Sequence, residues 1–175
     1  MPRYVYVATS LDGFIATKDG ELDWLFEIPN PEGSDYGFGK FISGMDAIIM
    51  GRNTFEKILT FEQWPYQKPV FVLSHRLQKI PETLSGKAEI LGENPKDLVA
   101  QLQERGYTNL YVDGGGVIQS FLEEDLIDEM IITRVPILLG DGFPLFGKLS
   151  QTLKFRHYKT QIYNNTLVQS YYTRH

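Results

Sequence analysis

The sequence contains no cysteine among its 175 residues. This absence excludes disulfide bonds, thiol nucleophiles and cysteine-ligated metals, and it fits a reducing cytoplasm. A basic excess is also missing: the formal net charge is −5, which argues against a nucleic-acid or membrane surface. No apolar run approaches the roughly 20 residues that cross a bilayer. We therefore expect a cytoplasmic protein without a nucleic-acid or membrane partner.

Histidine is scarce as well. The three histidines, His75, His157 and His175, have no metal-ligand spacing, and the chain has no Gly-x-Ser-x-Gly segment. We therefore expect neither a metal site nor nucleophilic catalysis by the protein. The remaining interpretation is a bound nucleotide that carries the chemistry, with the protein placing it and supplying perhaps one proton donor.

The most informative stretch is residues 109–122. A short apolar run, 110–112, predicts a buried strand, and apolar residues at helical spacing resume at Val117. Between them lie Asp113 and three glycines, Gly114, Gly115 and Gly116. Glycines at a helix start can bind a phosphate or pyrophosphate through free backbone N–H groups. A simple tight turn explains the glycines about equally well, and Gln119 breaks the G-x-G-x-x-G fingerprint.

Two further strands are followed by groups that suit phosphates. Residues 47–50 precede Gly51-Arg52-Asn53-Thr54, and residues 70–73 precede Ser74-His75-Arg76. Arginine binds phosphate through its fork of donors, although a surface arginine near a turn is the ordinary alternative. Ligands of open α/β sheets bind beyond the carboxyl ends of the strands, so three such ends in one chain favour a nucleotide site.

The rest of the chain alternates strands and helices. Strands are also expected at 4–8, 88–91 and 128–135, a helix opens at Asn94-Pro95, and a closing hairpin occupies 154–163 and 167–173. This order predicts one α/β domain over 1–175, with a mostly parallel sheet and an antiparallel edge. The loop 17–34 is interpreted either as a lid over a cleft or as a surface loop pinned by Trp24.

Residues 35–45 predict a helix with one apolar stripe of Phe38, Phe41, Ile42 and Met45. Asp35 lies one turn before Phe38 and shares its inward face. An inward acid is unusual without a partner, and the pattern alone favours an N-terminal capping role for it.

Several segments together resemble the dihydrofolate reductase-like superfamily. The resemblance is closest to bacterial proteins that share a domain with the reductase of riboflavin biosynthesis. The matching segments are 10–16, 49–56, 73–76, 113–116 and 132–133, in the family's order along nearly the whole chain.

The resemblance implies NADPH as cofactor, a small heterocyclic substrate and a homodimer. It implies cofactor contacts by Ala8, Ile15, Gly51, Arg52, Asn53, Thr54, Leu73, Ser74, Arg76, Gly114, Gly115, Gly116, Val117 and Ile118. It implies substrate contacts by Ala8, Asp35, Phe38 and Thr133. By the count from Met50, Asp35 takes the place of the family's catalytic acid, which reverses the capping interpretation. Arg52 and Arg76 favour NADPH over NADH.

Two departures leave the substrate open. Lys68 stands where folate-reducing members carry an arginine, and Gly39 stands where an aromatic residue packs on the substrate. The leading hypothesis is an NADPH-dependent reductase of a pterin-like heterocycle, dihydrofolate or a relative. The first alternative is the reductase of 5-amino-6-(5-phosphoribosylamino)uracil, with Lys40 or Lys68 near the substrate phosphate. The second is a nucleotide-binding protein without turnover.

Overall fold

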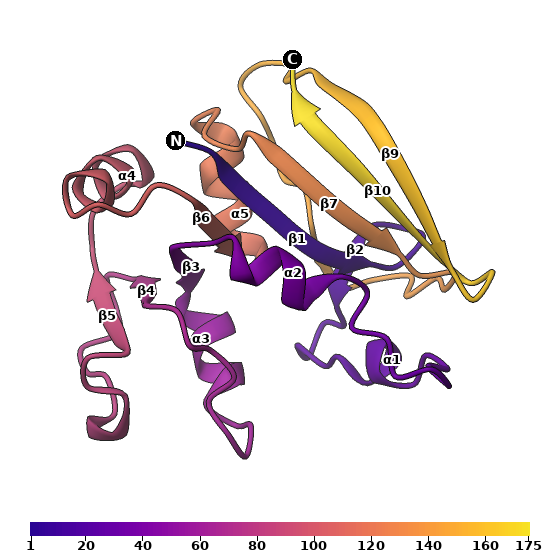
Figure 1. Cartoon of the computed structure of the whole chain (residues 1–175), viewed down its shortest axis with the longest axis horizontal. Helices are drawn as coiled ribbons and strands as arrows, with labels where there is room; N and C mark the ends of the chain where they lie inside the picture. Colours follow the sequence, from indigo (N-terminus) through magenta and orange to yellow (C-terminus); the bar gives the residue numbers. More distant parts are fainter.

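The computed structural model describes residues 1–175 and is built on one eight-stranded sheet (Figure 1). The strand order is β5-β4-β3-β6-β1-β7-β10-β9. The strands are β1 (Arg3–Thr9), β3 (Ala47–Gly51), β4 (Val70–Leu73), β5 (Ala88–Leu91), β6 (Leu110–Asp113), β7 (Glu129–Arg134), β9 (Phe155–Tyr163) and β10 (Leu167–Arg174). A separate two-stranded sheet pairs β2 (Phe14–Ala16) with β8 (Phe143–Pro144).

Six strands of the large sheet run parallel, and β10 of the terminal hairpin runs against them. β1 lies between β6 and β7, and β3 lies between β4 and β6, all in parallel. β10 pairs antiparallel with both β7 and β9. This confirms the predicted α/β class with its antiparallel edge.

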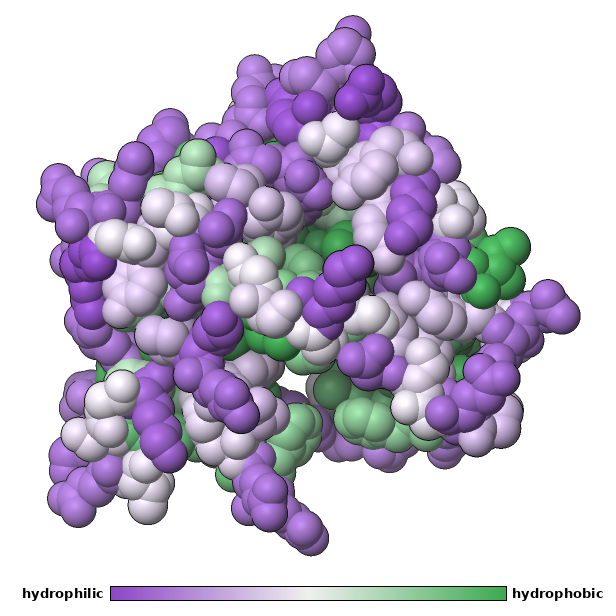
Figure 2. Space-filling view, viewed as in Figure 1, coloured by the Kyte–Doolittle hydropathy of each residue, from purple (hydrophilic) through white to green (hydrophobic).

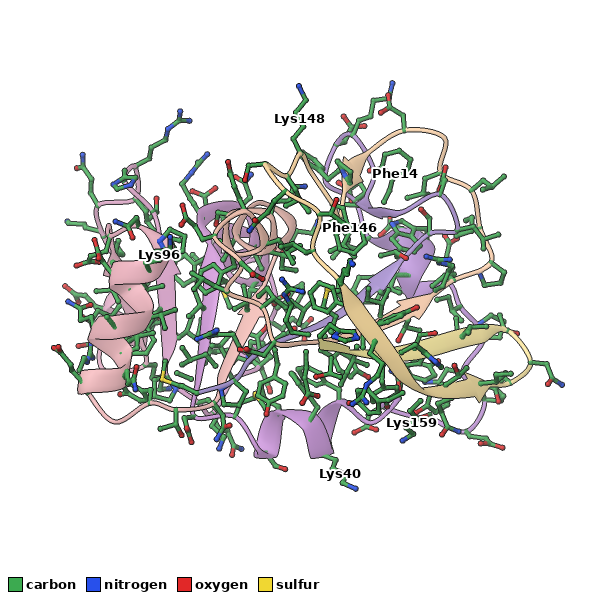
Figure 3. The ribbon with its side chains drawn as sticks, turned by 90° about the horizontal axis from the view of Figure 1, so that it is seen from above. Phe14, Lys40, Lys96, Phe146, Lys148 and Lys159 are labelled. Atoms are coloured by element: carbon green, nitrogen blue, oxygen red, sulfur yellow. The ribbon has the colours of Figure 1, made fainter.

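Helices cover both faces of the sheet. They are α1 (Asp23–Phe26), α2 (Phe38–Ser43), α3 (Arg52–Ile58), α4 (Pro95–Glu104) and α5 (Gly115–Glu123), with a 3-10 turn η1 (Glu82–Leu84). α4 and α5 bury Leu98 and Phe121 against one face, and α3 buries Phe55 against the other with α2. Figure 3 shows α2 and α5 on opposite sides of the sheet. None of the helices is both long and apolar enough to span a membrane.

The predicted start of α4 is confirmed. Asn94 accepts a hydrogen bond from the backbone N–H of Asp97, Pro95 fills the first helical position, and Gly106 follows the helix with φ of +91°.

Three local predictions need correction. The helix expected over 35–45 begins only at Phe38, because Tyr36 and Gly37 both adopt positive φ, at 55° and 86°. The segment 17–34 contains the helix α1, whose Trp24 is buried beside Val135. The sequence predicts no strand between 135 and 154, whereas the structure has β8 there, because strands this short carry no readable alternation in the sequence.

Candidate active site

The carboxyl ends of β1, β3, β6 and β7 lie on the same edge of the sheet, as their parallel pairing requires (Figure 1). The residues predicted at these ends are therefore brought together. Figure 2 shows an opening through the molecule below α2, between the part formed by α3 and the part formed by α1. We take this opening as the candidate site.

The glycine turn after β6 is tightly built. Gly114 has φ of +99° and ψ of 140°, a conformation that strongly favours glycine, and a Cβ there would overlap the hydroxyl of Thr54 at the start of α3. A Cβ on Gly115 would lie 2.6 Å from Cδ1 of Ile15, whereas a Cβ on Gly116 would meet nothing within 4 Å. The turn thus packs against two predicted cofactor residues and leaves open space beside the first turn of α5.

The two arginines expected at the cofactor lie on the surface. Arg52, in the first turn of α3, contacts Glu56 at 3.4 Å on the same helix. Arg76 makes no ion pair, and its backbone N–H donates to the hydroxyl of Ser74, which shapes the turn after β4. Both guanidinium groups are therefore accessible to a phosphate.

Ile118 does not fit its predicted cofactor role. Its side chain is fully buried in the core beneath the sheet, and its N–H donates to the carbonyl of Gly114 at 2.9 Å. The side chain and the N–H of Ile118 are therefore both engaged within the protein. Ile118 lies one helical turn after Gly114, where the hydrogen bonds within α5 begin. The neighbouring Val117 side chain is also buried.

Asp113 ends β6 directly before the glycine turn. The hydroxyl of Tyr66 lies 3.4 Å from its Oδ2. Burial raises the pKa of the Asp113 carboxyl to about 6, against the lowering effect of hydrogen bonds from Tyr111 and Tyr66. A carboxyl with this pKa carries a proton over part of the neutral range, which is what a general acid needs.

Asp35 has the opposite character. Its Oδ1 accepts the N–H of Gly37 and its Oδ2 accepts the N–H of Gly39, each at 2.9 Å. These backbone bonds hold the pKa of the exposed carboxyl below its usual value. A Cβ on Gly39 would lie 2.8 Å from that Oδ2, so the glycine makes room for the cap. The predicted inward-facing side chain is therefore wrong: Asp35 is an exposed anion that caps α2.

Three residues predicted at the substrate gather on the face of the sheet that α2 covers, two of them on strands and one on α2 itself. Ala8 of β1 pairs with Thr133 of β7, which is 5% exposed. The ring of Phe38 packs edge-on against that of Tyr6, with centroids 5.3 Å apart. Lys40 on α2 points away from the sheet (Figure 3), and Lys68 reaches the carbonyl of Ser43 at 3.4 Å. Neither lysine is directed at this face.

The turn after β1 is tied to the loop after β7. Asp12 accepts hydrogen bonds from the hydroxyl of Ser10 and from the N–H groups of Leu139 and Gly140, at 2.6, 3.2 and 2.8 Å. The pairing of β2 with β8 continues this connection. Figure 3 shows Phe14 and Phe146, from the two segments, on the α5 side of the molecule. The two segments thus form one cover beside the glycine turn.

Replacing Asp12 with alanine should loosen this cover. The change removes all three hydrogen bonds, and we expect amide hydrogen exchange in residues 14–16, 143 and 145 to become about tenfold faster, since the N–H of Leu145 donates to the carbonyl of Gly13. Asp19→Ala is the matched control, since Asp19 is an exposed residue of the next connection, between β2 and α1, and makes no side-chain bond. Equal exchange in the two variants would show that Asp12 does not hold the cover.

Sequence reasoning gave no role to Tyr66 or Gln169. Gln169 of β10 is fully buried and bonded to Thr133, and Tyr66 reaches Asp113 from the connection after α3. Of these two residues, only Gln169 stands out in the sequence itself. It occupies the inward position of the alternating strand between Leu167 and Tyr171, where a polar residue is unusual.

Comparison with known proteins identifies the family. The profile of the RibD C-terminal domain matches residues 4–168. Uncharacterized protein YwjB of Bacillus subtilis (strain 168) is 37% identical over 175 residues, which covers 97% of this chain and 96% of YwjB.

Solved structures agree with this match. A candidate riboflavin biosynthesis protein of Shewanella sp. PV-4 is 47% identical, with a TM-score of 0.96 and coverage of 100% of this chain and 99% of the other. A Thermotoga maritima deaminase and 5-amino-6-(5-phosphoribosylamino)uracil reductase shares the fold, with a TM-score of 0.77 at 16% identity over 99% of this chain and 56% of its own. The chain belongs to the family of RibD C-terminal domains, which has the dihydrofolate reductase-like fold.

Proposed function

We propose that the chain is an NADPH-dependent reductase that adds a hydride and a proton across a C=N bond in, or attached to, a pyrimidine-type heterocycle. The observation that carries the proposal is the end of β6, where a carboxyl able to hold a proton near neutral pH directly precedes the glycine turn. A proton donor and a cofactor-binding turn are thereby fixed to one strand end.

The residues at the strand ends fit this cofactor. Gly116 borders open space at the start of the nine-residue helix α5, where free backbone N–H groups favour a pyrophosphate. Arg52 and Arg76 add accessible guanidinium groups for the remaining phosphates. The chemistry that a bound NADPH would supply there is a hydride, with its own oxidation to NADP⁺.

The carboxyl groups of Asp35 and Asp113 have different roles, one in substrate binding and the other in proton transfer. Asp35 stays ionised and offers oxygen lone pairs to N–H groups of the substrate. Asp113 holds a proton on its carboxyl and delivers it to the substrate nitrogen as that atom gains negative charge. Divergent pKa values of this kind are the usual basis for assigning a binding anion and an acid.

The first substrate to test is 5-amino-6-(5-phosphoribosylamino)uracil, because the family is that of RibD and a structural neighbour carries this reductase name. In its open-chain imine form, the hydride would go to the sugar carbon and the proton to the attached nitrogen. Dihydrofolate, the leading candidate from sequence, is less well matched. Gly39 offers no ring to stack on its benzoyl part, and its side-chain space is taken by the Asp35 carboxylate.

The direct test follows the absorbance of reduced nicotinamide with the two substrates offered in parallel. Turnover of the ribosylaminouracil is expected and dihydrofolate should give at least about tenfold less. Turnover of dihydrofolate alone would return the pterin hypothesis to first place. NADPH binding without turnover of either would favour a nucleotide-binding protein.

Arg76 tests the choice of NADPH over NADH. We expect Arg76→Ala to raise the KM for NADPH about 10- to 100-fold, through loss of a charge-assisted contact to the extra phosphate. The KM for NADH should hardly change. Lys79→Ala is the control, because Lys79 is an exposed cation on the same connection. A parallel rise for both nucleotides would place Arg76 elsewhere on the cofactor.

A further inference from the structure

An apolar groove of about 300 Å³ lies between the end of α3 and the 3-10 turn η1. A volume of this size is at the lower end of the range of small-molecule sites, and it suits a single ring with a short arm. The walls of the groove come from the end of α3, from the connection that follows it and from the segment around η1, and they include Ile58, Leu59, Phe61, Trp64, Pro81 and Leu84.

The groove leaves large apolar side chains in contact with water. Leu59 is 40% exposed and Phe61 is 43% exposed, whereas Ile58 and Leu84 of the same groove are buried. Single apolar residues scattered over a surface are ordinary, but apolar side chains that line one shared hollow are typical of a binding site. A ligand that covers Leu59 and Phe61 would gain from the removal of this surface from water.

This groove is separate from the candidate active site. Arg52 and Thr54 lie in the first turn of α3, whereas the groove is at the other end of this seven-residue helix. Trp64 packs edge-on against Tyr66, with ring centroids 5.6 Å apart, and it is Tyr66 that reaches Asp113. A ligand in the groove would therefore leave the cofactor side of the sheet free.

Two carboxylates flank the groove. Glu62 follows Phe61 in the sequence, and Glu82 lies between Pro81 and Thr83, which both line the groove. Both glutamates are exposed, and neither takes part in an ion pair. Unpaired carboxylates beside an apolar hollow are complementary to a ligand that carries a cation at the edge of an apolar body.

The neighbouring cations do not line the groove. Lys57 contacts Glu21 at 3.8 Å, on the connection before α1, and Lys79 lies outside the lining of the groove. The lining itself contains no lysine or arginine, but it contains the aromatic rings of Phe61 and Trp64. The faces of such rings attract an ammonium group, most strongly in the case of tryptophan.

We propose that this groove is a second ligand site, which takes a small aromatic amine in its ammonium form. The ring of the amine lies in the groove and covers Leu59 and Phe61. Its ammonium group lies at the rim, where Glu62 and Glu82 attract it. The site goes beyond the proposed reductase function and does not depend on it.

The test compares two probes of nearly the same shape, 2-phenylethylammonium and the neutral 2-phenylethanol. Their dissociation constants are measured by calorimetry at low ionic strength, with and without saturating NADP⁺. We expect the ammonium probe to bind about fivefold more tightly, the effect of two exposed charges, and NADP⁺ to leave both constants unchanged. Equal affinities, no binding of the ammonium probe, or competition with NADP⁺ would overturn the proposal.

A variant that fills the groove locates the bound ring. Thr83→Phe places a side chain in the hollow from an exposed position, so it should abolish the binding of both probes without unfolding the protein. Ser85→Phe is the matched control, because Ser85 is also exposed beside η1 but does not line the groove. Binding that survives Thr83→Phe would place the probes elsewhere and refute the assignment.

The rim carboxylates are tested by their charge alone. Glu62→Gln combined with Glu82→Gln should reduce the preference for the ammonium probe to about one, because the ring keeps its contacts while the attraction is lost. Glu104→Gln combined with Glu123→Gln removes the same charge from exposed acids of other helices and should leave the preference unchanged. An equal loss in both double variants would show that only the net charge of the protein matters, and the proposed site would then be wrong.

Discussion

Replacing Gly114 with alanine is expected to lower the free energy of unfolding by about 3 kcal/mol, the combined cost of a strained backbone and an overpacked contact. At φ of +99° and ψ of 140° the backbone of this residue strongly favours glycine, and a Cβ would overlap the Thr54 hydroxyl. For a chain of this length the change corresponds to a fall of about 10 °C in Tm. Calorimetric melting measures it directly.

A double-mutant cycle divides the cost between its two causes. Thr54→Ala removes the hydroxyl that the new Cβ would meet, but it leaves the backbone angle as it is. The double variant should therefore recover part of the lost stability, with a coupling of about 1 kcal/mol. Full additivity of the two changes would show that the contact with Thr54 carries none of the cost.

Gly116→Ala separates a tight turn from a phosphate site. A Cβ at this helical position meets nothing, so the variant should be more stable than the wild type by about 0.5–1 kcal/mol. If a pyrophosphate binds here, the same Cβ should weaken NADPH binding about tenfold or more, since the backbone could no longer approach the ligand closely. Unchanged NADPH affinity would leave the three glycines with only a structural purpose.

The sheet could be predicted from the sequence because its strands are short apolar runs followed by glycine or by capped helices. Local signals of this kind, such as Asn94-Pro95 or the run of glycines, act within a few residues of one another. The start of α2 could not be predicted from its apolar stripe. The stripe begins at Phe38 but does not say whether the helix extends back to residue 35. The positive φ of Tyr36 makes the helix begin at Phe38, and the Tyr36 carbonyl accepts a hydrogen bond from Gln169 in the last strand.

The sequence treats the two acids differently. The local pattern favours a capping role for Asp35, and the N–H groups of Gly37 and Gly39 give it that role; the count along the chain turned this residue inward instead. Asp113 was visible only as the first residue of the glycine motif. Its raised pKa comes from burial and is moderated by Tyr66, which lies 47 positions away in sequence.

Asp113→Asn is expected to lower turnover by about 10²- to 10⁴-fold, the usual effect of losing a general acid, while NADPH affinity is unchanged. In the wild type, turnover should decline as the pH rises through about 6, the pKa of Asp113, because the proton is then lost. Tyr66→Phe removes a hydrogen bond that lowers this pKa, so its decline should move to higher pH. A wild-type rate that is constant across this range would remove Asp113 from the proton transfer.

The same carboxyl predicts a pH dependence of stability whose sign is unusual for an acid. Folding raises its pKa from 3.8 to about 6, so the folded state binds the proton more tightly than the unfolded state. Its stabilising contribution is complete below pH 3.8 and is lost as the pH rises through 6. Denaturant unfolding at pH 4.5 and pH 7 should therefore show that the wild type loses about 2 kcal/mol relative to Asp113→Asn. Parallel changes in the two proteins would mean that Asp113 titrates in the fold as it does in water, and its assignment as the acid would fall with that result.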